Sequence, residues 1–331
     1  MMINVKNHIG VPKYKQIINA IEKAISEGEL QKGDQIPSIN QIKNDNKLSR
    51  DTVLTAFNEL KNRGIITSIV GKGYYVSSEN VTVTQNIFLL FDELNSFKED
   101  LYNAFIDHLG SNIKVDIYFH HFNRNTFKKI ISDNKENYNY YVIMPANFIN
   151  TKSIIGQLPK DKVYILDQLH SDLKDYPAVY QNFEKSIFNN LTSVLESIKK
   201  YQKLILVFSD DKQPDAMQNG FIAFCENHNI SYGLVEHLKD KMLQEGELYI
   251  IPEDKDLLRL IKKMKTQGLI MAQDIGVISY NETLLKEIVE GGITTISTDF
   301  EGMGKRLAEM ILAKDQLQIE NPNQLIIRNS L

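Results

Sequence analysis

The sequence predicts a small N-terminal α+β unit of three helices and a two-stranded hairpin, followed by a larger α/β unit with parallel sheets in two lobes. Three observations support this. The chain has 331 residues, which is too long for one small domain. Residues 1–78 contain three short helical patterns and a hairpin pattern. From residue 86 onward, apolar strands alternate with amphipathic helices, which is typical of right-handed βαβ units. We therefore expect domains at residues 1–78 and 86–331, with a linker at 79–85.

Two helices are expected before residue 47. Apolar residues recur at helical spacing over residues 14–27, and Gly28 ends that pattern. A second helix is expected after Pro37 and Ser38, because Ser38 with Gln41 three residues later has the spacing of a capping box.

A third helix and a hairpin follow. Ser49 is an N-cap type of residue, and Gly64 is expected just past the end of the helix. The inner face of this helix has apolar side chains at three- and four-residue spacing, namely Val53, Ala56, Phe57 and Leu60. The β-rich runs at residues 65–70 and 74–76 flank a glycine turn and predict the hairpin.

The third helix has the properties of a recognition helix. Its outer face near the N-terminus carries Arg50, Asp51, Thr52 and Thr55. Arg50 can contact guanine O6 and N7 or a phosphate, and Thr52 suits a phosphate or a thymine methyl group. Lys72, at the hairpin tip, can approach the DNA backbone or minor groove. An exposed Arg or Lys alone is usually only solvated, so the order of the features carries the prediction. The predicted DNA contacts are Ser38, Ser49, Arg50, Asp51, Thr52, Thr55, Gly71 and Lys72.

Residues 12–76 resemble the winged-helix domain of the GntR family of bacterial transcription regulators. The motifs that carry the resemblance are Pro37-Ser38, Ser49-Arg50-Asp51-Thr52-Val53 and Gly71-Lys72-Gly73. Asn40 stands where the family often has a phosphate-binding arginine, and Leu54 where some members have a basic residue. The resemblance implies binding to operator DNA, with Arg50, Thr52 and Lys72 carrying more of the contact than usual.

The charge of the chain is divided unevenly between the two units. The net charge is −4, but residues 1–78 hold 11 Lys or Arg against 7 Asp or Glu, and the remainder holds 27 against 35. The basic excess therefore lies in the unit that would meet phosphates.

The N-terminus, the hydropathy and the cysteine content indicate the cellular compartment. The N-terminus has no secretory pattern, and no run of about 18 apolar residues suggests a membrane span. Cys225 is the only cysteine, which fits a reducing compartment. We therefore expect a cytoplasmic protein that does not contact a membrane.

The larger unit alternates strands and helices. Strands are expected at residues 87–91, 115–118, 141–144, 163–166, 204–208, 248–251, 276–279 and 294–296. Helices are expected at residues 98–109, 126–133, 184–200, 216–228, 255–267, 284–290 and 303–313. About 245 residues of this pattern favour two lobes with parallel sheets.

Polar residues follow many of these strands. In parallel sheets a ligand binds beyond the carboxyl ends of the strands, so these side chains are ligand candidates. The predicted contacts are Asp92, Asn95, Phe97, Asn147, Asp167, Asp210, Glu253 and Asn281, and Gln168, Asp211 and Asp254 adjoin them. Carboxylates, amides and an aromatic ring suit a small polyol such as a sugar. Capping of the following helices is the alternative role.

Residues 86–331 resemble the type I periplasmic sugar-binding fold, as used for the effector domain of the LacI family of repressors. The resemblance is clearest at residues 276–281 and 292–300, and it implies a ligand contact at Asn281 and a weaker one at Thr298. Residues 95–97 are similar to the aromatic-bearing loop after the first strand, and Asn147 falls where a ligand-binding aspartate often lies. The family's usual ligand-binding arginine is replaced, because that region holds Asp215, Ala216 and Met217.

These observations favour a ligand-responsive transcription regulator that acts as a homodimer on a roughly palindromic operator. Repression of sugar utilisation is the preferred interpretation. The resemblance suggests a monosaccharide effector similar to arabinose or fucose. The alternatives are an enzyme of sugar metabolism with a DNA-binding head, an activator with a non-sugar effector, and a structural DNA-binding protein. No catalytic residue or cofactor is predicted, because no complete nucleotide-binding motif is present. No metal site is predicted either, because the adjacent His120 and His121 should point to opposite sides of a strand.

Overall fold

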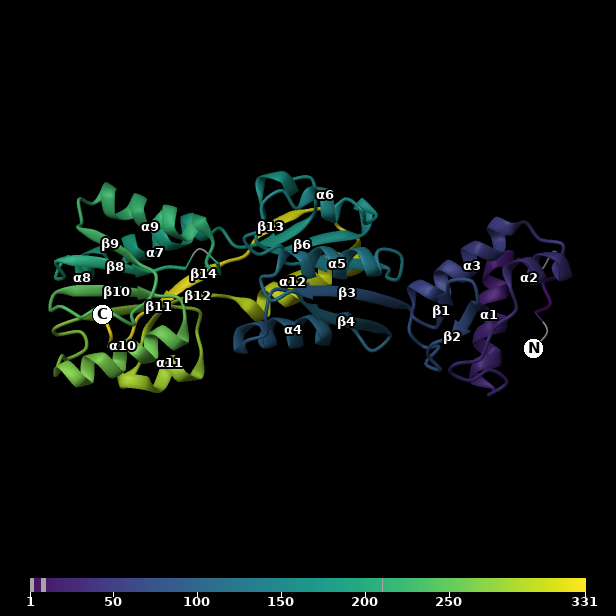
Figure 1. The fold of residues 1–331 in the computed structure, drawn as a ribbon, viewed down its shortest axis with the longest axis horizontal. Coiled ribbons are helices and arrows are strands. Elements are labelled where there is room, and N and C mark those ends of the chain that lie inside the picture. The colour runs from purple at the N-terminus through teal and green to yellow at the C-terminus, as the bar shows by residue number, and fades with distance from the viewer. Residues whose placement is uncertain (1–2, 7–9, 210) are drawn as a thin grey trace.

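Three bodies lie in a row along the long axis of the molecule (Figure 1). The structure is a computed structural model that describes residues 3–6, 10–209 and 211–331. The N-terminal head lies at one end, the first lobe lies in the middle and the second lobe lies at the other end. Within the described residues, no helix has the length and apolar character needed to cross a membrane.

The head is a three-helix unit with a hairpin wing. Its elements are α1 (Lys13–Ser26), α2 (Ile39–Asn46), α3 (Arg50–Asn62), β1 (Ile66–Ile69) and β2 (Gly73–Val76). The strands β1 and β2 pair antiparallel. The predicted inner face of α3 is fully buried, and it packs with the buried face of α1. Both predicted N-caps are confirmed, because Ser38 Oγ accepts from Gln41 N at 3.2 Å and Ser49 Oγ accepts from Thr52 N at 3.2 Å.

The first lobe is a six-stranded parallel sheet in the order β13-β7-β6-β5-β3-β4. The strands are β3 (Gln85–Phe91), β4 (Ile113–Phe119), β5 (Tyr140–Ile143), β6 (Val163–Asp167), β7 (Ala178–Tyr180) and β13 (Gln318–Glu320). The helices are α4 (Ser96–Leu109), α5 (Arg124–Asn134), α6 (Lys152–Ile155) and α12 (Phe300–Ala313), with short 3-10 turns at Lys160–Lys162 and Ser171–Leu173. Helices α4 and α12 cover one face, and α5 and α6 cover the other.

The second lobe repeats this plan with the order β14-β12-β11-β10-β8-β9. Its strands are β8 (Lys203–Val207), β9 (Tyr232–Val235), β10 (Glu247–Ile251), β11 (Gly276–Tyr280), β12 (Thr294–Thr298) and β14 (Asn323–Ile326). Only β14 runs antiparallel to its neighbour among these pairs. The helices are α7 (Phe183–Ser193), α8 (Leu195–Ile198), α9 (Asp215–Asn227), α10 (Asp254–Gln267) and α11 (Leu284–Ile288), with a 3-10 turn at Val289–Gly291.

The chain passes between the lobes three times. The passages follow Tyr180 at the end of β7, Thr298 at the end of β12 and Glu320 at the end of β13. As a result, α12 is the last helix in sequence but packs on α4 in the first lobe. The carboxyl ends of the strands in the two sheets thereby face one another. The residues that follow those strands lie between the lobes.

All eight predicted strands of the larger unit are present, and four strands were missed. These are β7, β9, β13 and β14, which have only three or four residues each and so lack a long apolar run. The prediction of one continuous helix at 184–200 was wrong. The segment is divided into α7 and α8 at Val194, whose φ of −119° and ψ of 22° are not helical.

The crossing of α4 and α12 depends on Gly304. A Cβ atom at this position would lie 2.3 Å from Leu101 O and 2.9 Å from Phe105 N, both of which are rigid helix backbone. We expect Gly304→Ala to lower the free energy of unfolding by about 1–3 kcal/mol, because the helices must separate. Chemical denaturation measures this change. Gly233→Ala is the matched control, because its Cβ meets only the ends of flexible side chains. An equal effect in both variants would contradict the explanation.

Candidate DNA interface and ligand cleft

The beginning of α3 presents an exposed polar surface. Arg50 and Asp51 are exposed, and Thr52 is half-buried. Two predicted contacts also stabilise the helix itself. Ser49 Oγ lies 2.8 Å from Thr52 Oγ1 in addition to capping the helix, and Thr55 Oγ1 donates to Asp51 O at 2.7 Å. Arg50 is therefore the side chain here with the longest reach toward DNA.

The wing tip is a tight turn held by the head. Gly71 and Gly73 have φ values of +75° and +114°, which side-chain-bearing residues rarely adopt. Lys72 N donates to Ile69 O at 2.9 Å, and its carbonyl accepts from Gln35 Nε2 at 2.7 Å. Gln35 was not predicted, and no local sequence motif marks it. Its bond orients the turn so that the exposed Lys72 stands at the tip.

Arg63 joins the recognition helix to the start of the first lobe. Its side chain is 10% exposed and forms an ion pair with Glu22 on α1. Its guanidinium also donates to Val83 O at 2.7 Å and to Val81 O at 3.2 Å, directly before β3. The segment predicted as a linker is therefore bonded to the head. Arg63 was missed because its partners are backbone carbonyls that no sequence pattern identifies.

A cleft between the lobes collects the residues that follow the strands. We name the first part of it, with a volume of about 250 Å³, the inner compartment. Six of the eight predicted ligand residues line it, namely Asp92, Asn95, Phe97, Asp167, Glu253 and Asn281. Asn147 lines an adjoining cavity instead. Asp210 lies outside the described residues, so its prediction stays a prediction.

The backbone is unusual where the strands enter this cleft. Positive φ values occur at His121 after β4, Ala146 after β5, Asp167 at the end of β6 and Asn281 after β11, and they range from 48° to 75°. Non-glycine residues seldom adopt this conformation, and such residues concentrate at functional sites. The strained positions therefore support a binding role for this edge.

The acidic groups of the inner compartment are held by specific partners. Asp92 forms a buried ion pair with Lys98 on α4. Asp167 accepts from Gln181 Nε2 at 2.5 Å, and burial raises the pKa of Asp167 above its usual range. Burial likewise raises the pKa of Glu253, which accepts from Gln213 Nε2 at 3.0 Å. These groups offer the acceptors and donors that ligand hydroxyls need.

Lys286 fixes the position of Asn281. This lysine is 1% exposed, and its Nζ donates to the carbonyl oxygen of Asn281 at 2.8 Å and to that of Tyr280. It also pairs with Asp254 at 2.8 Å, and burial lowers the pKa of Lys286. The side-chain Oδ1 of Asn281 is buried and has no hydrogen-bond partner in the described part of the chain. Asn281 lines the inner compartment, so a ligand there would lie beside this residue.

Aromatic rings form an apolar wall in the same compartment. Phe97 stacks on Phe300 with ring centroids 4.9 Å apart and an interplanar angle of 28°. Phe122, Phe183 and Tyr280 line the compartment as well. An aromatic wall beside carboxyl and amide groups matches the two kinds of surface that a sugar ring presents.

The lobes contact one another beside the cleft. Lys212 in the second lobe pairs with Glu93 in the first at 3.2 Å and lies 5.5 Å from the centre of the Phe122 ring. Asn147 Nδ2 donates to Gln213 O at 2.6 Å. These contacts were missed, because they join loops about 65 to 120 residues apart in the chain.

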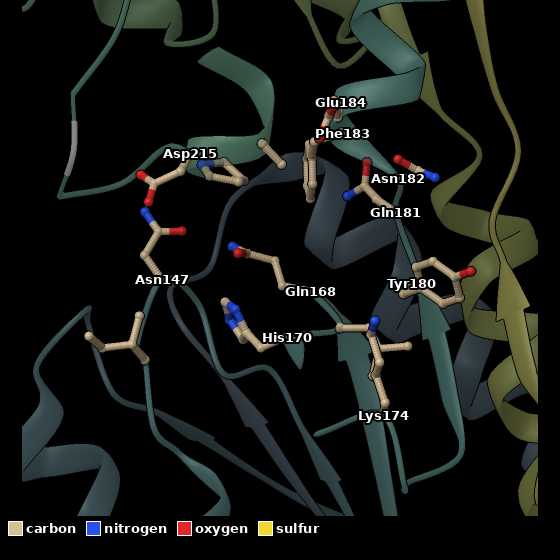
Figure 2. A pocket seen from close by; sticks show the side chains of 14 residues that line it. Asn147, Gln168, His170, Lys174, Tyr180, Gln181, Asn182, Phe183, Glu184 and Asp215 are labelled. Carbon is tan, nitrogen blue, oxygen red and sulfur yellow. The ribbon is translucent and has the colours of Figure 1, made fainter. Parts of the chain in front are cut away.

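A second cavity of about 490 Å³ adjoins the inner compartment, and we name it the outer compartment. Figure 2 shows Gln168 and His170 near its centre, Asn147 beside Asp215 on one side and Lys174 beside Tyr180 on the other. His170 Nε2 lies 2.6 Å from the carbonyl oxygen of Ala146. This cavity was not predicted, although the position of Gln168 after β6 was noted.

Two family models match the chain. Residues 13–76 match the gntR family of bacterial regulatory proteins, and residues 199–331 match a periplasmic binding protein-like domain. The HTH-type transcriptional repressor YtrA of Bacillus subtilis (strain 168) is 31% identical over 106 residues, covering 32% of this chain and 78% of that protein. The fold and site define a winged-helix head with a two-lobed, periplasmic binding protein-like domain. The chain belongs to the gntR family of bacterial regulatory proteins.

Two further relatives match over different lengths. The mannosyl-D-glycerate transport/metabolism system repressor MngR of Escherichia coli (strain K12) is 36% identical over 96 residues, which are 29% of this chain but only 38% of that protein. The arabinose metabolism transcriptional repressor of Geobacillus stearothermophilus is 23% identical over 367 residues, covering 97% of this chain and 96% of that protein.

Solved structures support the fold of the two lobes. A LacI family transcriptional regulator from Silicibacter pomeroyi has a TM-score of 0.64 at 14% identity, covering 74% of this chain and 98% of that one. A LacI family regulator from Enterococcus faecium, solved with bound ribose, has a TM-score of 0.60 at 17% identity, covering 74% and 98%. The predicted fold class is thereby confirmed.

The buried ion pair of Asp92 and Lys98 should be essential to the first lobe. Lys98→Met leaves a buried carboxylate without its partner, so we expect a loss of about 3–5 kcal/mol in the free energy of unfolding. The double variant Asp92→Asn with Lys98→Met should recover much of this loss. Lys199→Met is the control, because the Lys199–Glu196 pair is exposed and should change stability by less than about 1 kcal/mol. A neutral Lys98→Met would contradict this role.

Proposed function

We propose that this protein is a ligand-responsive, DNA-binding transcription regulator whose effector is a small sugar held between the two lobes. The observation that carries the proposal is the inner compartment, where buried carboxyl and amide groups face stacked aromatic rings. Residues 1–78 would be the DNA-binding domain, 79–85 the linker and 86–331 the effector domain. The DNA contacts would come mainly from Arg50, Thr52 and Lys72.

The comparisons support repression of sugar utilisation. The arabinose metabolism transcriptional repressor of Geobacillus stearothermophilus is matched over 96% of its length, and MngR is also a repressor. We propose a monosaccharide similar to arabinose or fucose as the smallest effector. The protein would act in the cytoplasm, without catalysing a reaction, as a homodimer with one recognition helix in each major groove.

The contacts of Arg63 provide a route from ligand to DNA. Because α3 is bonded to the segment before β3, a movement of the first lobe carries the head with it. In a dimer, a change in the angle between lobes would change the distance between the two heads. The ligand alters operator affinity only if it binds one of these arrangements better than the other.

A thermal-shift screen of the full chain against monosaccharides and disaccharides tests the proposal. A ligand that binds only the folded state raises the melting temperature. A selective hit should also change operator affinity in a DNA-binding assay. If no sugar raises the melting temperature, the sugar-sensor function is wrong.

Arg50→Ala should weaken operator binding by about 1–3 kcal/mol if its guanidinium contacts a guanine. Fluorescence anisotropy with labelled operator DNA measures the change. Arg259→Ala, in the second lobe, is the matched control and should bind operator normally. Unchanged binding by Arg50→Ala would remove this residue from the interface.

Asn281→Ala should preserve operator binding and weaken the response to ligand, since it removes the amide of a residue that lines the inner compartment. The loss should be about 1–3 kcal/mol of ligand binding, the usual value for a hydrogen bond to a buried polar group. Calorimetry with the sugar found in the screen measures it. Asn219→Ala, on the exposed face of α9, is the control. A normal response would show that the cleft is misassigned.

A further inference from the structure

The cleft between the lobes has two compartments that share a wall. Four residues line both the inner compartment and the outer compartment, namely Gln168, Gln181, Phe183 and Pro214. The outer compartment has a volume of about 490 Å³ and is the larger of the two. The inner compartment has a volume of about 250 Å³. A single sugar ring stacked on Phe97 would leave the outer compartment to water.

Gln168 lies at the shared wall with an unused amide. It is 8% exposed, and its side chain has no hydrogen-bond partner among the residues that the structure describes. Figure 2 shows the amide pointing into the middle of the outer compartment. Its neighbour Gln181 differs, because it donates to Asp167 and accepts from Thr298. The residue is more than nine-tenths buried while its amide faces the space between the compartments, so the position of Gln168 points to a ligand group at the junction.

The outer compartment suits a neutral, hydroxyl-rich group. His170 Nε2 must be the donor to Ala146 O, because a carbonyl oxygen only accepts, so Nδ1 is the ring nitrogen that this bond does not use. The one lysine, Lys174, is opposed by Glu184 and Asp215 in the same lining. This balance gives no excess positive charge for a phosphate. Tyr180 and Phe183 add aromatic surface.

We propose that the effector is a glycoside of two units, with one sugar ring in the inner compartment and a second neutral sugar unit in the outer compartment. This inference rests on the proposed function, since it assumes that the inner compartment binds a sugar. Gln168 contacts the ligand near the bond between the units. A monosaccharide fills only the inner compartment and is the weaker ligand.

Calorimetry of the full chain tests the inference with matched pairs of sugars. The probes are arabinose with arabinobiose, xylose with xylobiose, and glucose with maltose and cellobiose, and glucose 6-phosphate is added as an anionic probe. We expect one disaccharide to bind at least about tenfold more tightly than its own monosaccharide.

Two variants locate the added affinity. Ala216 lines the outer compartment and not the inner one, so Ala216→Phe should abolish the disaccharide's advantage by filling the space. Monosaccharide binding should stay within about twofold, which also shows that the variant is folded. Ala313→Phe makes the same change at an exposed position on α12 and should alter neither affinity. Gln168→Met, which keeps the volume but removes the amide, should weaken disaccharide binding by about tenfold.

The outcomes separate the two proposals. Equal affinity for each disaccharide and its monosaccharide would overturn the two-unit ligand and leave the sugar-sensor function intact. An advantage confined to glucose 6-phosphate, or equal loss of both sugars in Ala216→Phe, would overturn it as well. If no sugar binds, both the proposed function and this inference are contradicted.

Discussion

The two facing sheet edges are the constraint on which the rest of this structure depends. In a parallel sheet every strand ends at the same edge, so one edge gathers side chains from distant parts of the chain. Three passages between the lobes turn both edges toward one cleft. Asp92, Asp167, Glu253 and Asn281 meet there although they span 190 residues of sequence. The cleft is thus a consequence of topology, and its chemistry is set by the residue that follows each strand.

This arrangement places polar groups where their burial costs free energy. Asp92 and Lys98 form a buried ion pair, Lys286 is almost fully buried, and Asn281 has a left-handed backbone. Such groups persist only when the surrounding structure holds them in place. Here the apolar layers on both faces of each sheet supply that support. A ligand that supplies hydroxyl groups to the unpartnered Asn281 oxygen and Gln168 amide would offset part of the cost.

The sequence allowed the fold class and the strand ends to be predicted because both depend on local patterns. Apolar runs mark the long strands, and a polar residue after a run marks the cleft, which is how six of the eight ligand candidates came to line one compartment. The partners that hold them, such as Lys98, Gln213 and Lys286, could not be assigned. Lys98 and Lys286 occupy helical patterns that resemble solvated surface, and Gln213 lies 40 residues from Glu253 in the chain. The strands β7, β13 and β14 have only three or four residues each and carry no long apolar run, so the position of the hinge was not predictable either.

The ion pair that joins the lobes is more exposed than the contacts of Arg63 that tie the head to the first lobe. Glu93 and Lys212 are 31% and 40% exposed, and an ion pair of that kind stabilises by only about 0–1 kcal/mol. Arg63 is 10% exposed and bonds to α1 and to two carbonyls before β3, so the head should move with the first lobe as one body. By these two contacts the softer joint would lie between the lobes, where the cleft is. A ligand bound there would act on the contact that needs less free energy to change, and the joint at Arg63 would transmit the result to α3.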